Sequence, residues 1–482
     1  MPRTLRPCAA IVASCLVLVG GASAAGAPQR VSTDPFTNAD SQHATEVEPD
    51  TFAVGNTIVS AFQSGRFFDG GSSDIGFALS TDGGGTWTHG FLPSITVNSV
   101  PAGPWPRASD PAVAYDARHG TWIITSLAID NTGEGKAVLV SRSTDGGHTW
   151  SAPVTVASTS GFYDKTWIAC DNTATSPHYG NCYETWDDTN AGDLLLSATS
   201  SDGGLTWGAK KRTGDSAAGL GGQPQVQPGG TVIVPVLSAF TDGLLAYRST
   251  DGGATWSSSV TLSTLTDHEV AGGLRSEPLP SAEIDAAGKV YVAWHDCRFR
   301  TGCTSNDILL STSTDGLAWT TPVRVPIDPV TSTVDHFIPG LAVDRTTSGA
   351  SAHLGLTYHY YPQANCTPST CQLSLGFIAS VDGGATWSSP RRLRQPMKVT
   401  DLANTSQGYM VGDYISTSFV GANAVPVVAF GKPHAGNVFD EGMYTLTLPV
   451  RADGSFPQVT TDAPATAARG DRAMRAQPLV MR

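Results

Sequence analysis

The stretch "STDGGGTW" at residues 80–87 ends a short apolar segment with a polar, glycine-rich turn and a tryptophan. The same turn returns five more times along the chain, as "STDGGHTW" (143–150), "SSDGGLTW" (200–207), "STDGGATW" (249–256), a shortened "STDGLAW" (313–319) and "SVDGGATW" (380–387). A motif repeated at regular intervals marks a repeated structural unit, so the unit around the turn decides the fold.

Each residue type in the turn has a structural task. The aspartate accepts hydrogen bonds from backbone N–H groups and from the serine two residues earlier. Glycine supplies a positive φ, and the tryptophan ring is expected to be buried between neighbouring units. We therefore assign a structural role to the six turn aspartates, which are Asp82, Asp145, Asp202, Asp251, Asp315 and Asp382.

The repeating unit has four predicted strands. One strand precedes each turn, for example "DIGFALS" (74–80); two more precede that strand, and a looser one follows the tryptophan. Four antiparallel strands at a period of roughly 50–65 residues are typical of a β-propeller blade. Six units carry the turn, and residues 412–450 form a seventh with three strands, which residues 29–36 would complete. The sequence thus predicts one all-β propeller of four-stranded antiparallel blades, with seven blades favoured and six as the alternative.

The chain divides into four segments. Residues 1–24 have a basic start, an apolar run and the "ASA" cleavage pattern of a secretory signal peptide. Residues 25–39 are an N-terminal segment with a candidate ring-closing strand, 40–450 the propeller and 451–482 a flexible tail. We expect a secreted, monomeric protein, extracellular or periplasmic, with a lipid anchor at Cys15 as the less favoured alternative.

Charge and cysteine content narrow the function. The formal net charge is −13, and no Lys/Arg cluster is present, which argues against nucleic-acid binding. No later segment has the roughly 18 consecutive apolar residues that a membrane span needs. Six cysteines follow the signal peptide in three close pairs, typical of disulfides in an exported protein: Cys170/Cys182, Cys297/Cys303 and Cys366/Cys371. Their spacing does not fit a zinc site, and we predict no metal and no cofactor.

The repeated turn resembles the Asp-box motif S-x-D-x-G-x-T-W, so residues 40–450 resemble the sialidase-like, BNR-repeat β-propellers. In such a propeller, the starts of the first strands and the connections after the second strands surround a central funnel. These positions are rich in polar and ionisable residues. Among them are Glu48, Asp110, Asp164, Lys165, His336 and Asp413. Carboxylates can act as acid and base on a sugar, so a glycan or polysaccharide is the expected ligand.

The resemblance to sialidases also implies specific roles. Sialidases use a tyrosine nucleophile, which a glutamate assists, and an aspartate acid/base. The resemblance puts the aspartate at Asp69, the glutamate at Glu277 and the tyrosine at Tyr409 or Tyr414. The expected substrate-binding residues are Arg66, Arg107, Arg275, Arg298, Tyr358 and Tyr360. Two of the family's three carboxylate-binding arginines are not found, and Val47 stands where the first is expected.

Three functions follow from this pattern. The first is an exo-glycosidase resembling the exo-α-sialidases, and the second is a propeller that binds glycans or cell surfaces without cleaving them. The third is a polysaccharide lyase, in which tyrosine and histidine residues abstract a proton beside a uronate carboxylate.

Overall fold

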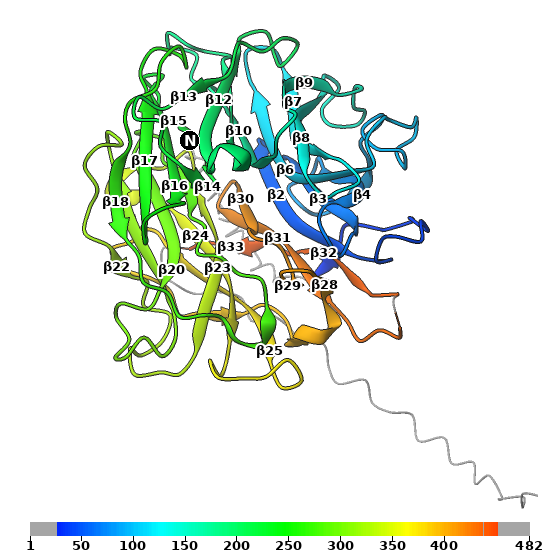
Figure 1. The fold of residues 1–482 in the computed structure, drawn as a ribbon. Helices are drawn as coiled ribbons and strands as arrows, with labels where there is room; N and C mark the ends of the chain where they lie inside the picture. Colours follow the sequence, from blue (N-terminus) through cyan, green and yellow to red (C-terminus); the bar gives the residue numbers. More distant parts are fainter. Residues whose placement is uncertain (1–26, 437, 452–482) are drawn as a thin grey trace, which may run out of the picture.

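The structure is a computed structural model that describes residues 27–436 and 438–451. These residues form antiparallel sheets arranged around a common centre, without any α-helix in the described part (Figure 1). The all-β prediction is therefore confirmed. The predicted signal peptide lies outside the described residues, as does the predicted tail apart from Arg451.

The strands fall into groups that follow one another along the chain. The first strand of each group is β2 (Glu46–Val54), β6 (Arg107–Asp116), β10 (Tyr163–Cys170), β14 (Gly219–Leu220) with β15 (Gln225–Val226), β19 (Ser281–Ile284), β23 (Asp335–Val343) or β30 (Ser416–Val420). The second is β3 (Thr57–Arg66), β7 (Thr121–Ile129), β11 (Cys182–Asp188), β16 (Val232–Ser238), β20 (Val290–Asp296), β24 (Leu354–Tyr361) or β31 (Asn423–Gly431).

The third strand is β4 (Ser72–Ser80), β8 (Gly135–Ser143), β12 (Leu194–Ser200), β17 (Gly243–Ser249), β21 (Asp307–Ser313), β25 (Gln372–Ser380) or β32 (Glu441–Thr445). The outer strands are β5 (Thr88–Phe91), β9 (Val154–Ser158), β13 (Lys211–Arg212), β18 (Val260–Thr264), β22 (Val323–Arg324), β26 (Arg391–Arg392) and β1 (Gln29–Arg30). Further short elements are β27 (Met397–Lys398), β28 (Ala403–Thr405), β29 (Gly408–Met410), β33 (Leu448–Pro449) and the 3₁₀ turns η1 (Thr189–Ala191), η2 (Ala271–Gly273), η3 (Gly349–Ser351) and η4 (Val399–Asp401).

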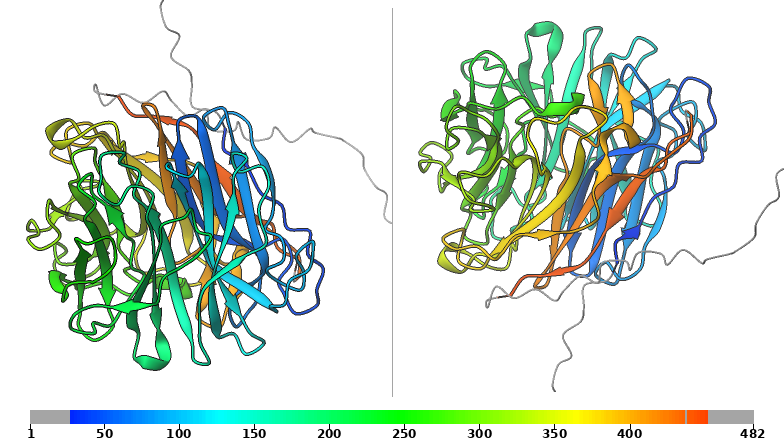
Figure 2. Two further views of the ribbon diagram at one scale, coloured as in Figure 1. Left: turned by 90° about the horizontal axis from the view of Figure 1, so that it is seen from above. Right: turned by 90° about the horizontal axis from the view of Figure 1, so that it is seen from below.

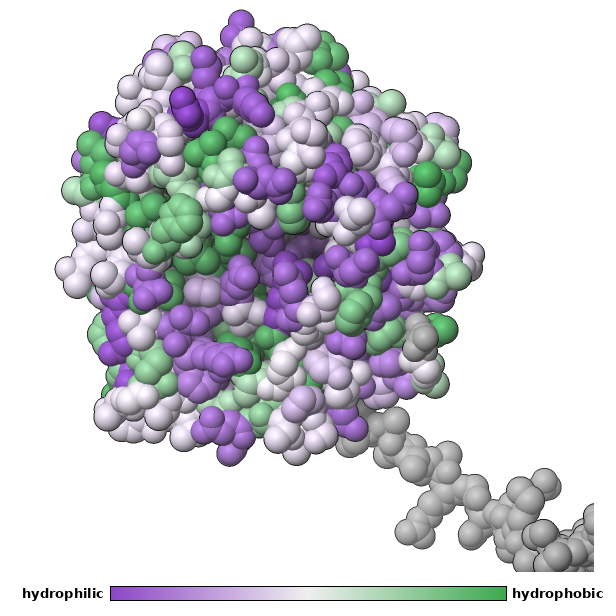
Figure 3. Space-filling view, viewed as in Figure 1, coloured by the Kyte–Doolittle hydropathy of each residue, from purple (hydrophilic) through white to green (hydrophobic). Residues whose placement is uncertain are grey.

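The first strands surround the centre of the molecule. Each contacts the first strand of the next group, in the order β2, β6, β10, β15, β19, β23 and β30, and β30 contacts β2 in turn. At the outer side of the last group, β1 pairs with β32, so both ends of the described chain contribute to one sheet (Figure 2). The face shown in Figure 3 is hollowed near its centre, and hydrophilic residues surround the hollow.

The Asp-box turns have the hydrogen bonds that their sequence predicts. In the first turn, Asp82 accepts bonds from the Ser80 hydroxyl at 2.9 Å, the Thr86 amide at 2.9 Å and the Thr86 hydroxyl at 2.7 Å. These bonds, led by the Thr86 amide, lower the pKa of Asp82 to about 2. The carboxylate is thus fully used within its own turn, which agrees with a structural role.

The predicted burial of all six Asp-box tryptophans is wrong for five of them. Only Trp256 is buried, with 5% of its surface exposed. The other five pack against core clusters while part of each ring remains in contact with solvent; they are Trp87, Trp150, Trp207, Trp319 and Trp387. The turn lies at the surface end of its strand, so its tryptophan covers the edge of the core from outside.

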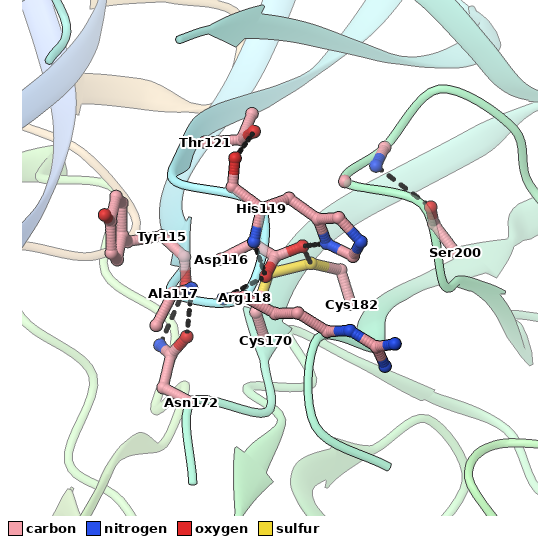
Figure 4. The surroundings of a disulfide bond; sticks show 12 residues. Tyr115, Asp116, Ala117, Arg118, His119, Thr121, Cys170, Asn172, Cys182 and Ser200 are labelled. Carbon is pink, nitrogen blue, oxygen red and sulfur yellow. Dashed lines mark hydrogen bonds and ion pairs between the residues drawn. A yellow bond between two sulfur atoms is a disulfide. The ribbon is translucent and has the colours of Figure 1, made fainter. Parts of the chain in front are cut away.

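All three predicted disulfides are formed: Cys170–Cys182, Cys297–Cys303 and Cys366–Cys371. Figure 4 shows the first of them, which joins the paired strands β10 and β11. Beside it, the Asp116 carboxylate lies 2.6 Å from Nδ1 of His119 and accepts a 3.0 Å bond from the Arg118 amide. No helix in the described part of the chain is long and apolar enough to cross a membrane.

The buried Trp256 provides a test of the packing between units. Its ring lies edge-on to Tyr247 of its own group at 5.4 Å and near Tyr183 of the preceding group at 6.5 Å. Trp256→Ala should lower the free energy of unfolding by about 3–5 kcal/mol, since it leaves a large cavity. Urea denaturation should show a smaller loss for Trp87→Ala, because that ring is partly exposed. Equal losses in the two variants would contradict this packing.

Candidate functional site

Four first strands carry the same distortion. The pairing of β2, β6, β10 and β23 with their second strands shifts register near the start of each strand, as at a β-bulge. Inside these bulges Glu48, Asp110, Lys165 and Ile338 have positive φ values of 55°, 50°, 49° and 46°. Such a backbone is strained in a residue other than glycine and is often found at functional sites.

The three ionisable residues among them, Glu48, Asp110 and Lys165, line one pocket, with a volume of about 110 Å³. Its other charged or aromatic lining residues come from the first, third and fifth groups: Arg66, Asp69, Phe162, Tyr163, Asp164 and Arg275. Ser406 and Gln407, between β28 and β29, also line it. The bulges therefore aim ionisable side chains of three successive groups at one point.

Asp413, which is fully buried, neutralises two cations of the pocket lining. Its carboxylate accepts short hydrogen bonds from Nζ of Lys165 and from Nη2 of Arg275. Burial raises the pKa of Asp413, but Arg275 and Lys165 outweigh this effect and hold the pKa below its usual value. Asp413 therefore stays ionised and joins the seventh group to the third and to the segment before β19.

Glu48 has the opposite protonation state. Its carboxyl group accepts hydrogen bonds from the Gln63 side chain and from the Asp413 amide, the latter at 3.3 Å. Burial, together with the charges of Asp413 and Asp110, raises the pKa of Glu48 to about 8. Burial also raises the pKa of Asp164, to about 6. At neutral pH Glu48 is thus protonated beside the ionised Asp413.

Of the residues assigned from sequence, Arg66, Asp69 and Arg275 line this pocket together. Asp69 stands at its mouth with 55% of its side chain exposed and pairs with Nη1 of Arg107 at 2.6 Å. The Arg107 guanidinium also lies over the Phe67 ring, 4.2 Å from its centroid. The structure thus brings four of the expected residues to one place.

The other expected residues lie elsewhere or are otherwise engaged. Tyr414 is buried and donates a 3.1 Å hydrogen bond to the Pro111 carbonyl, and burial raises its pKa well above the usual value. Tyr409 accepts a backbone bond from Arg275, while Glu277 is exposed. Within the described residues, no hydrogen bond joins Glu277 to either tyrosine. Arg298 forms a two-point ion pair with Asp296 outside the pocket, at 2.9 and 2.6 Å.

Tyr358 and Tyr360 flank His336 on neighbouring strands, with ring centroids 5.5 and 6.0 Å from the imidazole. Neither tyrosine belongs to the pocket lining. Burial lowers the pKa of His336 to about 4, so this imidazole is neutral.

The His336 side chain belongs to a cluster that has ligand atoms for a metal. Within the described chain, Asp307, Asp328 and His336 bring one such atom each to within 4.8 Å of the others. However, Nη2 of Arg300 lies 2.5 Å from Asp307 and 2.8 Å from Asp328, and Arg324 pairs with both carboxylates. Because two guanidinium groups already neutralise the acids, the cluster is an ion-pair network and a poor cation site.

Several central residues received no role from sequence, although they stood among the polar positions: Glu48, Asp110, Asp164, Lys165 and Asp413. One signal was an acid directly before proline near the start of a first strand, as in Glu48-Pro49 and Asp110-Pro111. The bulge that gives these acids their direction is not visible in the sequence.

A comparison with protein families agrees with the Asp-box pattern. Residues 131–339 match the family described as the BNR repeat-like domain. This finding confirms the resemblance to the sialidase-like, BNR-repeat proteins that the six turns indicated. A search of curated proteins found no match.

Several solved structures resemble this chain at low identity. A protein of unknown function from Dyadobacter fermentans is 16% identical, with 73% of this chain and 99% of that chain covered and a TM-score of 0.46. The Hadza microbial sialidase Hz136 is 15% identical, with 86% and 66% covered and a TM-score of 0.45. An α-L-arabinanase from Penicillium chrysogenum is 12% identical, with 89% and 99% covered and a TM-score of 0.46.

A glycine permits the close approach of Asp413 to Glu48. Gly412 has a φ of 139°, and an added Cβ would lie 2.8 Å from the Glu48 backbone and 2.7 Å from the Tyr414 carbonyl. Gly412→Ala should therefore destabilise the fold and shift Glu48, whereas Gly421→Ala, in open space at a φ of 55°, should cost only about 1–2 kcal/mol. Thermal unfolding of both variants checks this difference. An equal loss of stability would show that the contact with Glu48 is not tight.

Proposed function

We propose that this BNR-repeat protein is a secreted glycoside hydrolase that binds its glycan in the pocket around Glu48. The observation that supports this most is the meeting of four acids in one lining, Glu48, Asp69, Asp110 and Asp164, of which Glu48 and Asp164 have different pKa values, about 8 and about 6. Glycoside hydrolysis commonly needs one protonated and one ionised carboxyl group on either side of the bond.

In this proposal Glu48 is the general acid. Its raised pKa keeps a proton at neutral pH, which it donates to the glycosidic oxygen as the bond to the sugar breaks. Asp164 is the proposed base, which takes a proton from the attacking water. Asp69, the acid/base residue expected from the resemblance, is retained as the alternative to Asp164 because it lines the same pocket.

The Tyr–Glu nucleophile of sialidases has less support. Its chemistry needs the glutamate within hydrogen-bond reach of the tyrosine hydroxyl, roughly 2.6–3.2 Å. Tyr414 donates to Pro111 instead, so Glu277, Tyr409 and Tyr414 stay secondary candidates.

Aromatic side chains near the mouth support glycan binding. Phe162 lines the pocket, and Phe68, directly before Asp69, is 53% exposed. Exposed aromatic rings offer apolar faces on which sugar rings can stack. Phe240 and Phe299 are also exposed and follow the second strands of their groups, as Phe68 does.

For the fold we propose a propeller of seven blades, because the contacts between first strands pass through seven groups and return to β2. For the location we propose export as a monomer, with propeller bounds of 40–450. The three disulfides support an oxidising compartment such as the periplasm or the extracellular space.

The protonation states predict a bell-shaped pH profile. Activity should fall above pH 8 as Glu48 ionises and below pH 6 as Asp164 gains a proton, given their pKa values of about 8 and 6. Glu48→Gln should abolish hydrolysis, and Asp164→Asn should lower it strongly. Measuring kcat/KM against pH on chromogenic glycosides and polysaccharides tests both roles. Full activity of Glu48→Gln would rule out the acid role of Glu48.

The exposed aromatic residues near the pocket predict an effect on substrate binding without an effect on stability. Phe68→Ala should raise KM about fivefold or more without changing the melting temperature, because Phe68 is exposed and packs little. Leu205, which is 54% exposed on the third Asp-box turn, is a matched control. If Phe68→Ala and Leu205→Ala bind substrate equally well, Phe68 does not contact the sugar.

A binding protein without catalysis is the second candidate function. It is favoured by the ion pairs that engage Lys165, Arg275 and Asp413 with one another, since a catalytic group must be free to react. The products distinguish the possibilities: a hydrolase releases a reducing sugar, a lyase an unsaturated uronate that absorbs ultraviolet light, and a binding protein neither.

A further inference from the structure

Gln63 joins the proposed general acid to a buried cation. It is fully buried on β3, and its partner on β2 is Val47, the residue directly before Glu48. Its Nε2 donates a short hydrogen bond to Oε2 of Glu48, and its Oε1 accepts a 2.9 Å bond from Nη1 of Arg66. A single amide group therefore connects Glu48 to Arg66.

The chemistry of the two partners fixes the orientation of this amide. A guanidinium has N–H donors and no acceptor, so Arg66 can bind only the oxygen of Gln63. The NH₂ group of Gln63 must then face Glu48 and donate to its Oε2. Oε1 of Glu48 has the weaker contact, a 3.3 Å bond from the Asp413 amide. Because the unprotonated oxygen of a carboxyl group is its better acceptor, the proton of Glu48 belongs on Oε1.

Arg66 is suited to hold the amide in this orientation. Its side chain is buried, and Nη1 also donates to the Gly71 carbonyl at 2.9 Å. Within the described residues Arg66 forms no ion pair, and its Nε has no hydrogen-bond partner. In that part of the chain, Gln63 is therefore the only side chain to which the guanidinium donates.

Other elements also bring ionisable groups near Glu48. They are Asp413 and Tyr414 before β30, Asp110 of β6, Lys165 of β10 and Arg275 before β19. Asp413 and Asp110 oppose the ionisation of Glu48, whereas the two cations favour it. Among the described residues, none of these side chains donates a hydrogen bond to the Glu48 carboxyl group, so the direct side-chain contact comes from Gln63.

We propose that Gln63 is a positioning residue for acid catalysis: held by Arg66, it keeps the acid proton of Glu48 on Oε1 and stabilises the charge that appears when this proton leaves. This inference rests on the proposed function, because it concerns the same acid. In the step, the O–H bond at Oε1 breaks and the proton bonds to the glycosidic oxygen as that oxygen leaves the sugar carbon. The electron pair of the O–H bond stays on the Glu48 carboxylate. The bond from Gln63 to Oε2 then becomes charge-assisted and roughly twice as strong as a neutral one.

Titration of Glu48 in the Gln63→Leu variant tests this link. The loss of a donor to the ionised carboxylate should raise the pKa of Glu48 by about 1 pH unit. Carboxyl ¹³C NMR of glutamate-labelled protein measures this pKa, and the Glu48→Gln variant assigns the signal. A pKa equal to that of the wild type would overturn the inference, whether or not the protein cleaves a glycoside.

Kinetics separate a positioning role from a structural one. In Gln63→Leu the basic limb of the kcat/KM profile should move to higher pH by the same amount, and kcat at pH 7 should fall about tenfold. KM should change little, because Gln63 does not belong to the pocket lining. An NMR shift without a shift of this limb would overturn the acid role of Glu48, and the proposed function with it. An unchanged NMR titration overturns only the role of Gln63.

Gln225→Leu is the matched control. Gln225 is also a buried glutamine, and its Nε2 donates to the Ala282 carbonyl at 2.8 Å, outside the pocket lining. Both leucine variants should lower the melting temperature, but only Gln63→Leu should shift the titration of Glu48. If Gln63→Leu does not fold, Gln63→Asn should shift the titration in the same direction, because its shorter side chain cannot bridge both partners. Equal shifts in the two leucine variants, or no shift in folded Gln63→Asn, would overturn the inference.

Discussion

The site depends on one buried anion, the carboxylate of Asp413. It binds Lys165 from β10 and Arg275 from the segment before β19, residues 248 and 138 positions away in sequence. Removing one partner of such a buried group typically costs about 3–5 kcal/mol, because the remaining charges lose their compensation. Asp413 therefore links the last group of strands to two others across the centre, and it fixes the two cations beside Glu48.

The same arrangement sets the protonation of the acids. Burial is the largest effect that opposes ionisation of Glu48, and the negative charge that Asp413 keeps next to it adds to that effect. Like charges in a confined space separate the pKa values of neighbouring carboxyl groups, as acid–base catalysis requires. The bulges in β2, β6 and β10 bring these groups together, and the strained backbone of Glu48, Asp110 and Lys165 persists because the surrounding sheet holds it.

The sequence predicted best those features that depend on contacts between residues close in sequence. The Asp-box turns and the disulfides form between residues that are close in sequence, so their patterns predicted them correctly. The burial of the tryptophans was less predictable, since it depends on contacts with residues distant in sequence, and only Trp256 is buried among the six. For the site, the sequence found Arg66, Asp69 and Arg275 but gave no role to Glu48, because a bulge and a contact across the centre are properties of the folded chain.

The central claim is that the pocket around Glu48 holds a glycan with the bond to be cleaved next to the Glu48 carboxyl group. A crystal structure of Glu48→Gln soaked with the best substrate from the glycoside panel tests this claim most directly. We predict a sugar ring in the pocket, with its glycosidic oxygen roughly 2.6–3.2 Å from the side-chain amide of residue 48. A sugar bound elsewhere, with the pocket containing only solvent, would contradict the account.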